Sequence, residues 1–434
     1  MAEVPAFALS QYGKSIKGIV ELETTEESVE VVLTSCILFA LLESMRGFHH
    51  SSMSHLVAGL KVLRESQISG RFPSPHSSLL SRALQWLFIR ADSQLMDVGG
   101  AEFGRSVQVY QPMEYFMPDY FRDIGESLFY IELLHNRVMY VLMRWEPIIS
   151  EHGYTASVTD GLEKDRNKYR GELARFRTAH ERMLDSKLGL NSIEGHRAGH
   201  LAISLSSKVT AVLLEVDDFV NPEQDFDKSL ETFQAMVEES EQFIELSRRI
   251  NTIASRSSNG PDESKPRAIL TMSSGCVLPL YFVAARCRHS ATRHKALRLL
   301  QTCKRREGLW DSDLAADIAE KVISIEESNA KAIFEKQRLR SPSSYDTSEQ
   351  TMTPGDLSNM TKPELDVPDE ARIRTVVMYY DRVGDTGRAE FHQRPPWTVI
   401  PSAGNKLEGF RSIEQVAFGT PGPRAVVREV LMHT

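Results

Sequence analysis

The sequence predicts an all-α protein, an irregular bundle or solenoid of paired helices that ends in a disordered linker and a short β-rich tail. Three observations support this fold class. Apolar residues recur at helical spacing through most of residues 1–337. Residues 338–370 are rich in Ser, Thr, Pro and acidic side chains and contain almost no aromatic residues, which favours disorder. Residues 371–434 contain two β-rich runs around a glycine-bearing turn. These three ranges are the predicted domains.

The first helical pair begins where Thr24 and Glu27 have the spacing of a capping box. A largely apolar helix follows and ends at Gly47, and we expect it to be buried on more than one side. The next helix carries one apolar stripe, formed by Met53, Leu56, Val57, Leu60 and Leu63. A short turn between two such helices indicates an antiparallel pair. The apolar run at 29–42 is shorter than the roughly 20 residues that span a bilayer, so we expect no membrane segment.

Further helices are predicted at 77–97, 121–145, 161–187, 197–219 and 226–253. No fixed repeat relates them. The segment 275–327 is expected to hold three short helices. In the last of these helices, either Asp311 or Ser312 is the predicted N-cap. Its predicted buried face consists of Leu314, Ile318, Val322 and Ile325.

The C-terminal tail is predicted to contain a small β-hairpin. The runs RIRTVVMYYDRV (372–383) and RAEFHQRP (388–395) are rich in β-forming residues, and GDTG lies between them. The preceding residues 338–370 cannot bury enough apolar surface to fix a structure, so they are expected to act as a linker.

Composition and cysteine spacing exclude several classes of function. The net charge of −8 gives no support to a chain that binds nucleic acid over its whole surface. The four cysteines form no CxxC pair and have no histidine at zinc-finger spacing, so we expect reduced, buried thiols at Cys36, Cys276, Cys287 and Cys303. The acidic Glu3 and the lack of a basic n-region argue against a secretory signal, which favours an intracellular protein.

A run of basic residues is the clearest candidate for an interaction surface. Between Arg286 and Arg306 the only charged side chains are basic, and acidic residues dominate the stretch Glu215–Glu245. The run forms either an interaction or nuclear-import face, or a face paired internally with that acidic stretch. The residues of the candidate face are Arg286, Arg288, Lys304, Arg305 and Arg306.

Three other groups of residues have simpler interpretations than a functional site. The first is an acidic group without the spacing of an EF-hand, so we interpret it as a solvated turn in which Asp225 caps the next helix. Its members are Asp217, Asp218, Glu223, Asp225 and Asp227. A histidine group is interpreted as a surface cluster of His49, His50 and His55. An aromatic group either packs in the core or lines a pocket for a small apolar effector, and consists of Tyr110, Tyr115, Phe116, Tyr120 and Phe121.

No catalytic, cofactor or metal-binding residue is predicted. The chain contains no G-x-S-x-G elbow, no phosphate-binding loop, no H-E-x-x-H and no dinucleotide-binding glycine motif after a strand. We therefore expect a protein that is not an enzyme and needs no cofactor.

Two parts of the chain resemble a known family. The phrases LPLYFVAARCR and TCKRREGLWDSDLAA match the C-terminal part of the regulatory domain of fungal six-cysteine zinc-cluster transcription factors. The phrase VVLTSCILFALLESMRGFHHSSMSHLVAGLKVLRE resembles the early helices of the same domain. The likeness covers most of residues 8–335 and is strongest at both ends. It implies a nuclear transcription regulator that acts through an effector or through protein partners.

The chain departs from this family in its cysteines. Members read DNA with six cysteines that hold two zinc ions, whereas this chain has four, none in a CxxC pair. We therefore expect no sequence-specific DNA binding by this chain alone, and partners among other transcription proteins or a full-length zinc-cluster factor. Three explanations stay open: a regulator that acts through a partner, a gene model without its first exon, and a domain recruited to another role. The alternative function is a non-catalytic helical scaffold or small-molecule-binding protein outside the nucleus.

Overall fold

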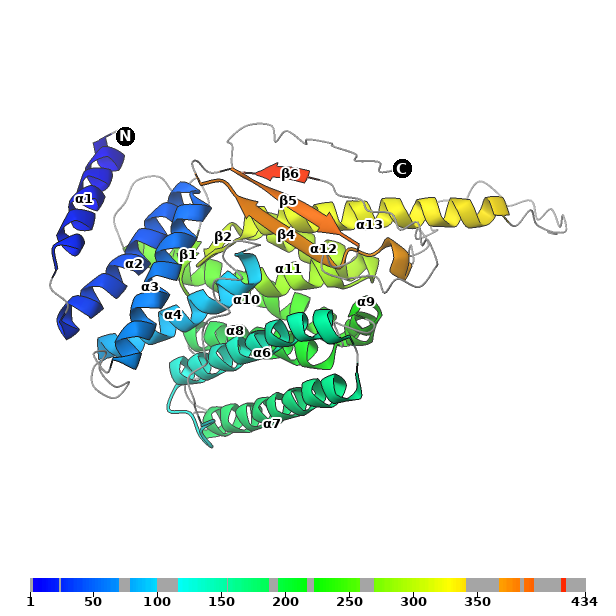
Figure 1. Cartoon of the computed structure of the whole chain (residues 1–434), viewed down its shortest axis with the longest axis horizontal. Helices are drawn as coiled ribbons and strands as arrows, with labels where there is room; N and C mark the ends of the chain where they lie inside the picture. Colours follow the sequence, from blue (N-terminus) through cyan, green and yellow to red (C-terminus); the bar gives the residue numbers. More distant parts are fainter. Residues whose placement is uncertain are drawn as a thin grey trace.

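A computed structural model of the chain consists mainly of α-helices, with two three-stranded β-sheets in its described part (Figure 1). The structure describes residues 3–22, 25–69, 79–99, 116–153, 155–186, 194–216, 222–257, 269–340, 367–382, 386–393 and 415–418. The predicted fold class, all-α with a short β-containing C-terminal region, is therefore confirmed.

The N-terminal part of the structure contains α1 (Glu3–Val20), α2 (Glu26–Arg46), α3 (His49–Ile68) and α4 (Leu79–Val98). The capping box of α2 lies one residue later than predicted. Thr25 Oγ1 accepts from the Ser28 N–H at 3.2 Å, and Ser28 Oγ accepts from the Thr25 N–H at 2.7 Å. The short serine hydroxyl thus takes the place predicted for a glutamate. Gly47 ends α2 with a left-handed φ of 85°, as predicted.

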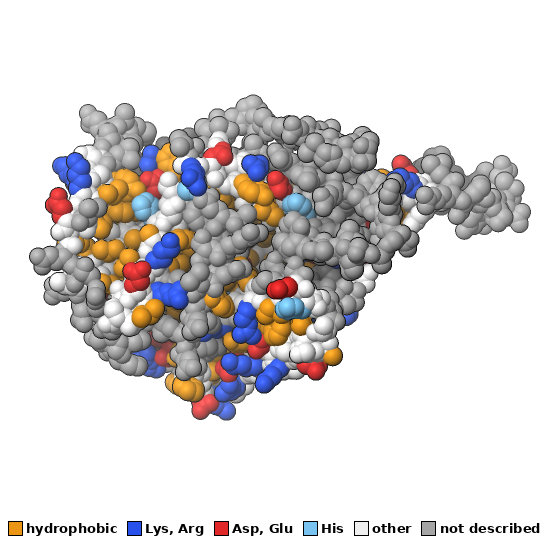
Figure 2. All heavy atoms as spheres, viewed as in Figure 1, with side chains coloured by type: hydrophobic (Ala, Val, Ile, Leu, Met, Phe, Trp, Pro, Cys, Tyr) orange, Lys and Arg blue, Asp and Glu red, His pale blue; other side chains and the backbone are white. Residues whose placement is uncertain are grey.

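Helix α2 is buried on one side against α3 and α4. Leu33, Met53 and Phe88 meet in this core. Contrary to the expectation of burial on several sides, Val31, Leu38 and Met45 lie at seven-residue spacing on an exposed face. Hydrophobic side chains are visible in Figure 2 over the region of α1 to α3.

The length of α2 corrects the expectation that its apolar run is too short to span a bilayer. The stretch Ser28–Arg46 has 19 residues and a mean hydropathy of 1.7, which suffices by length and composition alone. In the structure 44% of the tested window is buried inside the protein.

The middle of the chain forms a layer of helices that continues from α4 (Figure 1). Helix α6 packs against α4, α7 and α8, and α8 packs against α10. Asp123 begins α6 by accepting the Glu126 N–H at 2.8 Å, and the helix continues seven residues beyond the predicted end at Trp145. The elements of this layer are α6 (Ile124–His152), α7 (Ala156–Ser186), α8 (Glu194–Glu215), α9 (Pro222–Asp225), η1 (Phe226–Ser229) and α10 (Leu230–Ser257).

The segment 275–327 differs from the predicted three short helices. Two short helices are followed by a two-stranded hairpin and a long helix, because Gly308 turns the chain at a left-handed φ of 64°. Asp311, one of the two predicted N-caps, is the N-cap of the long helix, and its Oδ1 accepts from the Asp313 N–H at 2.8 Å. The elements are β1 (Ile269–Thr271), α11 (Val277–Arg286), α12 (Ser290–Cys303), β2 (Arg305–Glu307), β3 (Trp310–Asp311) and α13 (Ser312–Arg340). Strand β2 pairs in parallel with β1 and antiparallel with β3.

The predicted face of α13 packs against the C-terminal hairpin. Ile318, Val322 and Ile325 are buried in one cluster with Met378 and Phe391, and Leu314 is half-buried beside them. Strands β4 (Thr375–Tyr380) and β5 (Gly387–His392) pair antiparallel, which confirms the predicted hairpin, and β6 (Gln415–Phe418) extends the sheet. Residues 383–385, which include half of the predicted GDTG turn, lie outside the described residues.

The ends of the predicted linker 338–370 are structured. Helix α13 continues to Arg340, and a short helical turn η3 (Asp369–Ala371) follows the buried Val367. Residues 341–366 lie outside the described residues.

Candidate functional site

The first half of the basic run is paired inside the protein. Arg288 and Arg293 donate to the two oxygens of Glu326, each at 2.7 Å. Arg286 and Arg288 also pair with Glu223 of α9. Only 1% of the Arg293 side chain is exposed, and Glu326 is fully buried. A buried guanidinium needs a carboxylate because an unpaired charge is costly in a low dielectric.

The second half of the run is also largely internal. Arg305 is buried and donates to Glu307 at 2.9 Å, and Arg306 pairs with Asp311 and donates to the Ser44 carbonyl. The Lys304 side chain is 50% exposed and pairs with Asp313 at 2.7 Å.

The five candidate residues therefore do not form one exposed basic face. The interpretation that fits their geometry is internal pairing, and one of the acids involved, Glu223, belongs to the acidic stretch Glu215–Glu245. The other acids come from β2, β3 and α13, which the sequence did not indicate. On the described part of the face in Figure 2, basic and acidic side chains are intermixed.

The same network anchors the C-terminal hairpin to the helices. The Ile373 N–H donates to Glu326 Oε1 at 2.8 Å. Arg372 donates to the Glu223 carbonyl at 2.7 Å, and Arg286 donates to the Arg374 carbonyl at 3.0 Å. These bonds position the hairpin, and Arg286, a residue of the candidate interaction face, takes part in them.

The acidic and histidine groups have separate partners. Asp225 pairs with Lys228 and Asp227 with Arg372; Asp225 stands at the start of η1 without a side-chain capping bond. The ring of His55 is 2.8 Å from the Tyr12 hydroxyl, whereas His50 contacts Ser54 and His49 lies against Tyr380. Within the described ranges, no three His, Cys, Asp or Glu side chains could hold a metal ion. Asp217 and Asp218 lie outside the described residues.

The aromatic group does not line a common pocket in the described residues. Phe121 is fully buried in the core with Phe176, and the Phe116 residue is 91% exposed. Tyr120 is also exposed, and Tyr110 and Tyr115 lie outside the described residues.

The four cysteines are free thiols, as expected. Cys276, Cys287 and Cys303 are buried and Cys36 is half-buried. Burial raises the pKa of Cys36 to about 11, so this thiol stays protonated at neutral pH.

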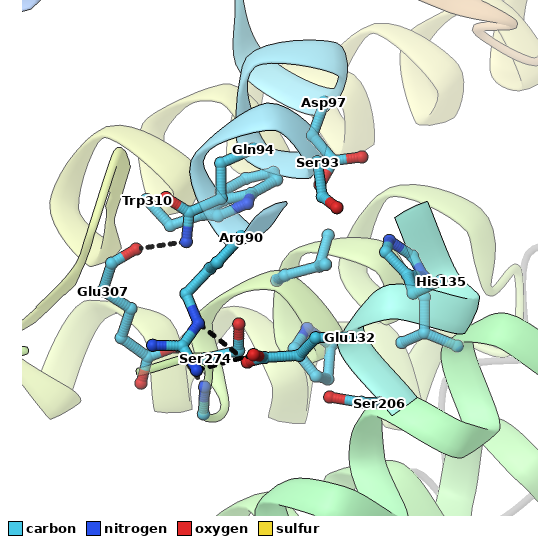
Figure 3. Close-up of a pocket in the computed structure, with 14 residues that line it drawn as sticks. Arg90, Ser93, Gln94, Asp97, Glu132, His135, Ser206, Ser274, Glu307 and Trp310 are labelled. Carbon is cyan, nitrogen blue, oxygen red and sulfur yellow. Dashed lines mark hydrogen bonds and ion pairs between the residues drawn. The ribbon is translucent and has the colours of Figure 1, made fainter. Parts of the chain in front are cut away.

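A small cavity lined by both polar and apolar side chains lies where α4, α6, α8, α11 and the β2–β3 hairpin meet (Figure 3). The space open to the centre of a water molecule is about 30 Å³, enough for about two waters at 10–15 Å³ each. Its lining comes from helices and strands far apart in sequence, among them Arg90, Gln94, Asp97, Glu132, His135, Ser206, Leu278, Glu307 and Trp310.

A buried ion pair forms one wall of this cavity. Arg90 of α4 donates through Nε to Glu132 Oε1 at 2.8 Å and through Nη2 to Oε2 at 2.6 Å. Trp86 donates its indole N–H to the same carboxylate, and the Arg90 guanidinium also donates to the Met272 carbonyl. Both oxygens of Glu132 therefore accept hydrogen bonds, and its charge is balanced by Arg90.

Glu307, in β2, forms the opposite wall and caps the N-terminus of helix α11. Its two oxygens accept the N–H groups of Gly275, Cys276 and Val277 at 2.9–3.2 Å. The negative charge lies at the positive end of the helix, where it stabilises the unpaired N–H groups. A side chain at Gly275 would collide with Glu307 and Phe243, so this approach requires glycine.

Gln94 holds the turn of the β2–β3 hairpin against α4. Its amide donates to the Glu307 carbonyl and accepts the Leu309 N–H, both at 2.9 Å. A side chain at Gly308 would collide with Gln94. The cavity thus lies between the N-terminal helices and the C-terminal segment, and Gln94 joins the two.

Asp97, His135 and Trp310 are the cavity side chains with unused hydrogen-bonding capacity, and the His135 Nε2 atom and the Trp310 indole N–H have no hydrogen-bond partner in the described part of the chain. Burial raises the pKa of Asp97 to about 7, and the nearby Trp310 indole N–H lowers it less. Burial lowers the pKa of His135 to about 4, so its ring is neutral.

The tautomer of His135 follows from its neighbour. Thr210 donates its hydroxyl proton to the Ser206 carbonyl at 2.8 Å, so its oxygen accepts from His135 Nδ1 at 3.2 Å. Nε2 of the neutral ring therefore carries a lone pair, and this atom has no hydrogen-bond partner. The ring is 8% exposed and points from α6 toward the cavity (Figure 3).

Sequence reasoning did not identify this site, because its residues come from helices and strands that lie far apart in the sequence. A partial signal exists in the spacing of polar residues within apolar helices. Arg90, Gln94 and Asp97 recur at helical spacing on one face of α4, and Glu132 and His135 do so on α6.

Comparison with known proteins gives one partial similarity at the level of transcription regulation. The chain is similar to the aspercryptin biosynthesis cluster-specific transcription regulator of Emericella nidulans, with 28% identity over 95 residues. This similarity covers 21% of the chain and 15% of the relative, far less than two thirds of that protein. No family model matches the chain, and no solved structure matches it. The comparison therefore supports a relationship to transcription regulators over about a fifth of the chain.

Proposed function

We propose that this chain is the regulatory part of a fungal transcription regulator related to the zinc-cluster factors, and that it acts in the nucleus by binding a protein partner or an effector. The observation that carries the proposal is its partial similarity to a cluster-specific transcription regulator. The all-α architecture is compatible with it. The role is non-catalytic: the chain senses an effector or partner and presents the result to the transcription machinery.

The cavity between α4, α6, α8 and α11 is the proposed effector site. Its walls belong both to the N-terminal helices and to the C-terminal segment, so a bound molecule would change how these parts are held together. Direct DNA reading is not part of the proposal. The chain has four cysteines where a binuclear zinc cluster needs six, and three of the four are buried in the core.

A fluorescent fusion of the full chain in a fungal host tests the location. We expect nuclear accumulation in at least one growth condition. Exclusion from the nucleus under all conditions would contradict the proposal and would favour a helical scaffold or small-molecule-binding protein outside the nucleus.

A gel-shift experiment tests the claim that the chain does not bind DNA by itself. We expect no retardation of random duplex DNA by the purified chain at physiological salt. Retardation that is abolished by charge reversal at Lys304, an exposed residue of the basic run, would contradict it.

A further inference from the structure

The cavity between α4, α6, α8 and α11 offers more hydrogen-bond acceptors than donors. The Arg90 guanidinium is directed to Glu132 and to the Met272 carbonyl, and the Gln94 amide is directed to the Glu307 carbonyl. Asp97 and the Nε2 atom of His135 are acceptors that these donors do not reach, and the Trp310 indole N–H is the one lining donor without a hydrogen-bond partner among the described residues. A molecule that fits this cavity must therefore supply N–H or O–H groups.

The charge of the cavity favours a cation over a neutral donor. Glu132 is neutralised by Arg90, and Glu307 by Arg305 at 2.9 Å. The Trp310 indole lies near Asp97, and among the described residues these two arginines pair with the glutamates and not with Asp97. Its carboxyl group is thus the acid in this cavity that lacks a positive counterpart, and the Trp310 ring beside it is a surface that attracts cations.

We propose that the cavity binds a small primary amine in its protonated form, whose ammonium group donates to the Asp97 carboxylate and to His135 Nε2. The space for about two water molecules matches an ammonium group with one or two carbons, or the ammonium end of a longer amine. Leu278 and Trp310 line the same cavity and are the surfaces for the carbon atoms. The role of this amine as an effector rests on the proposed function; its binding does not.

Binding of an ammonium ion should release a proton near neutral pH. Burial holds the pKa of Asp97 at about 7, and a cation in contact with the carboxylate lowers it. The other titratable groups that line the cavity are Arg90, Glu132, His135 and Glu307. The two glutamates are paired with arginines, and His135 is already neutral, so Asp97 is the group whose proton leaves.

The test is a titration of the purified full chain, labelled with ¹⁵N-histidine, with methylammonium chloride at pH 7. Sodium chloride and tetramethylammonium chloride at equal ionic strength are the controls, because neither cation can donate an N–H. We expect the Nε2 resonance of His135 to move upfield as it accepts a hydrogen bond, with a dissociation constant on the order of millimolar for a ligand of two heavy atoms. Calorimetry in two buffers of different ionisation enthalpy should show proton release.

Two variants and a matched control assign the effect to this cavity. Asp97→Asn should weaken binding about tenfold or more and abolish the proton release, and His135→Phe should weaken it without abolishing that release. Asp92→Asn is the control: Asp92 lies on the same helix with a pKa also raised by burial to about 7, but it accepts from Asn136 at 2.9 Å and does not line the cavity. Binding by this variant should equal that of the parent chain.

Equal shifts of the His135 resonance with methylammonium and sodium would overturn the inference, as would unchanged affinity in both Asp97→Asn and His135→Phe. This result can be distinguished from a test of the proposed function. If the chain binds methylammonium as described but never enters the nucleus, the amine site is supported and the regulatory role is rejected. If it enters the nucleus but does not bind methylammonium, only the amine site is rejected.

Discussion

Removal of the Glu326 carboxylate should destabilise the whole molecule, because this side chain joins α12, α13 and the C-terminal hairpin. In Glu326→Ala, Arg288 keeps its second partner, Glu223, at 2.6 Å. Arg293 loses its carboxylate while only 1% of its side chain is exposed, and an uncompensated buried charge costs about 3–5 kcal/mol. The Ile373 N–H also loses its acceptor, at a cost of about 1–3 kcal/mol.

We therefore expect Glu326→Ala to lower the free energy of unfolding by roughly 4 kcal/mol or more, a large share of the about 5–15 kcal/mol of a typical protein. Urea unfolding followed by circular dichroism measures it. Glu327→Ala is the matched control, because this neighbouring side chain is 30% exposed and lies 3.6 Å from the ring of His294, so it should cost less than about 1 kcal/mol. A loss below about 1 kcal/mol for Glu326→Ala would refute the reasoning.

The effect should also depend on pH. Burial alone would raise the pKa of Glu326, but the Arg288 and Arg293 guanidiniums outweigh it and hold the pKa below its ordinary value. A lowered folded-state pKa means that this stabilisation is present above the unfolded-state pKa of about 4.3 and is lost as the pH falls through the folded-state value. The difference between the parent chain and Glu326→Gln should therefore shrink below about pH 4.

Three other predictions concern separate parts of the fold. Arg305→Ala should lower the free energy of unfolding by about 2–3 kcal/mol, because Glu307 stays buried without a positive partner and keeps only its hydrogen bonds from backbone N–H groups. Lys304→Ala should change it by less than about 1 kcal/mol, and similar losses for the two variants in urea unfolding would mean that Arg305 is not an internal residue. Gly308→Ala should lower the free energy of unfolding by about 2 kcal/mol or more, because φ is 64° and the new methyl group would collide with Gln94. Gly171→Ala, in open space on α7, should raise it by about 0.5–1 kcal/mol, and equal melting temperatures of the two variants would contradict this. Burial and the neighbouring His200 lower the pKa of His180 to about 4, so the free energy of unfolding should fall by up to about 3 kcal/mol as the pH drops from about 6.5 to about 4. His180→Phe should reduce this dependence on pH, and an NMR titration that gives His180 a pKa near 6.5 would disprove the prediction.

The sequence predicted the helices well where one apolar face is decisive. In α3 and α13 the residues named from periodicity are buried or half-buried as expected, and Gly47 and Asp311 end and begin helices at the predicted places. The β-hairpin of the tail was also found from its β-rich runs. These features depend on local spacing, which a single sequence contains.

The parts that the sequence did not predict depend on contacts between distant residues. In the sequence, a run of eight basic residues indicates an exposed surface. In the fold, α13 and α9 place Glu326 and Glu223 beside the first part of this run. The hairpin at Gly308 was predicted as part of a helical segment because Gln94, its partner, lies more than two hundred residues earlier. The cavity was missed for the same reason. Its polar residues, seen on one helix at a time, are equally consistent with a solvent-exposed helix face.

The measurement that tests the central claim most directly is a tethered reporter assay. The full chain is fused to an unrelated DNA-binding domain in a fungal host, and expression of a reporter gene under the matching operator is compared with that given by the DNA-binding domain alone. The proposed function predicts that the fusion changes reporter expression at least severalfold, in either direction. A fusion that is present in the nucleus at equal amounts and leaves expression unchanged would contradict it.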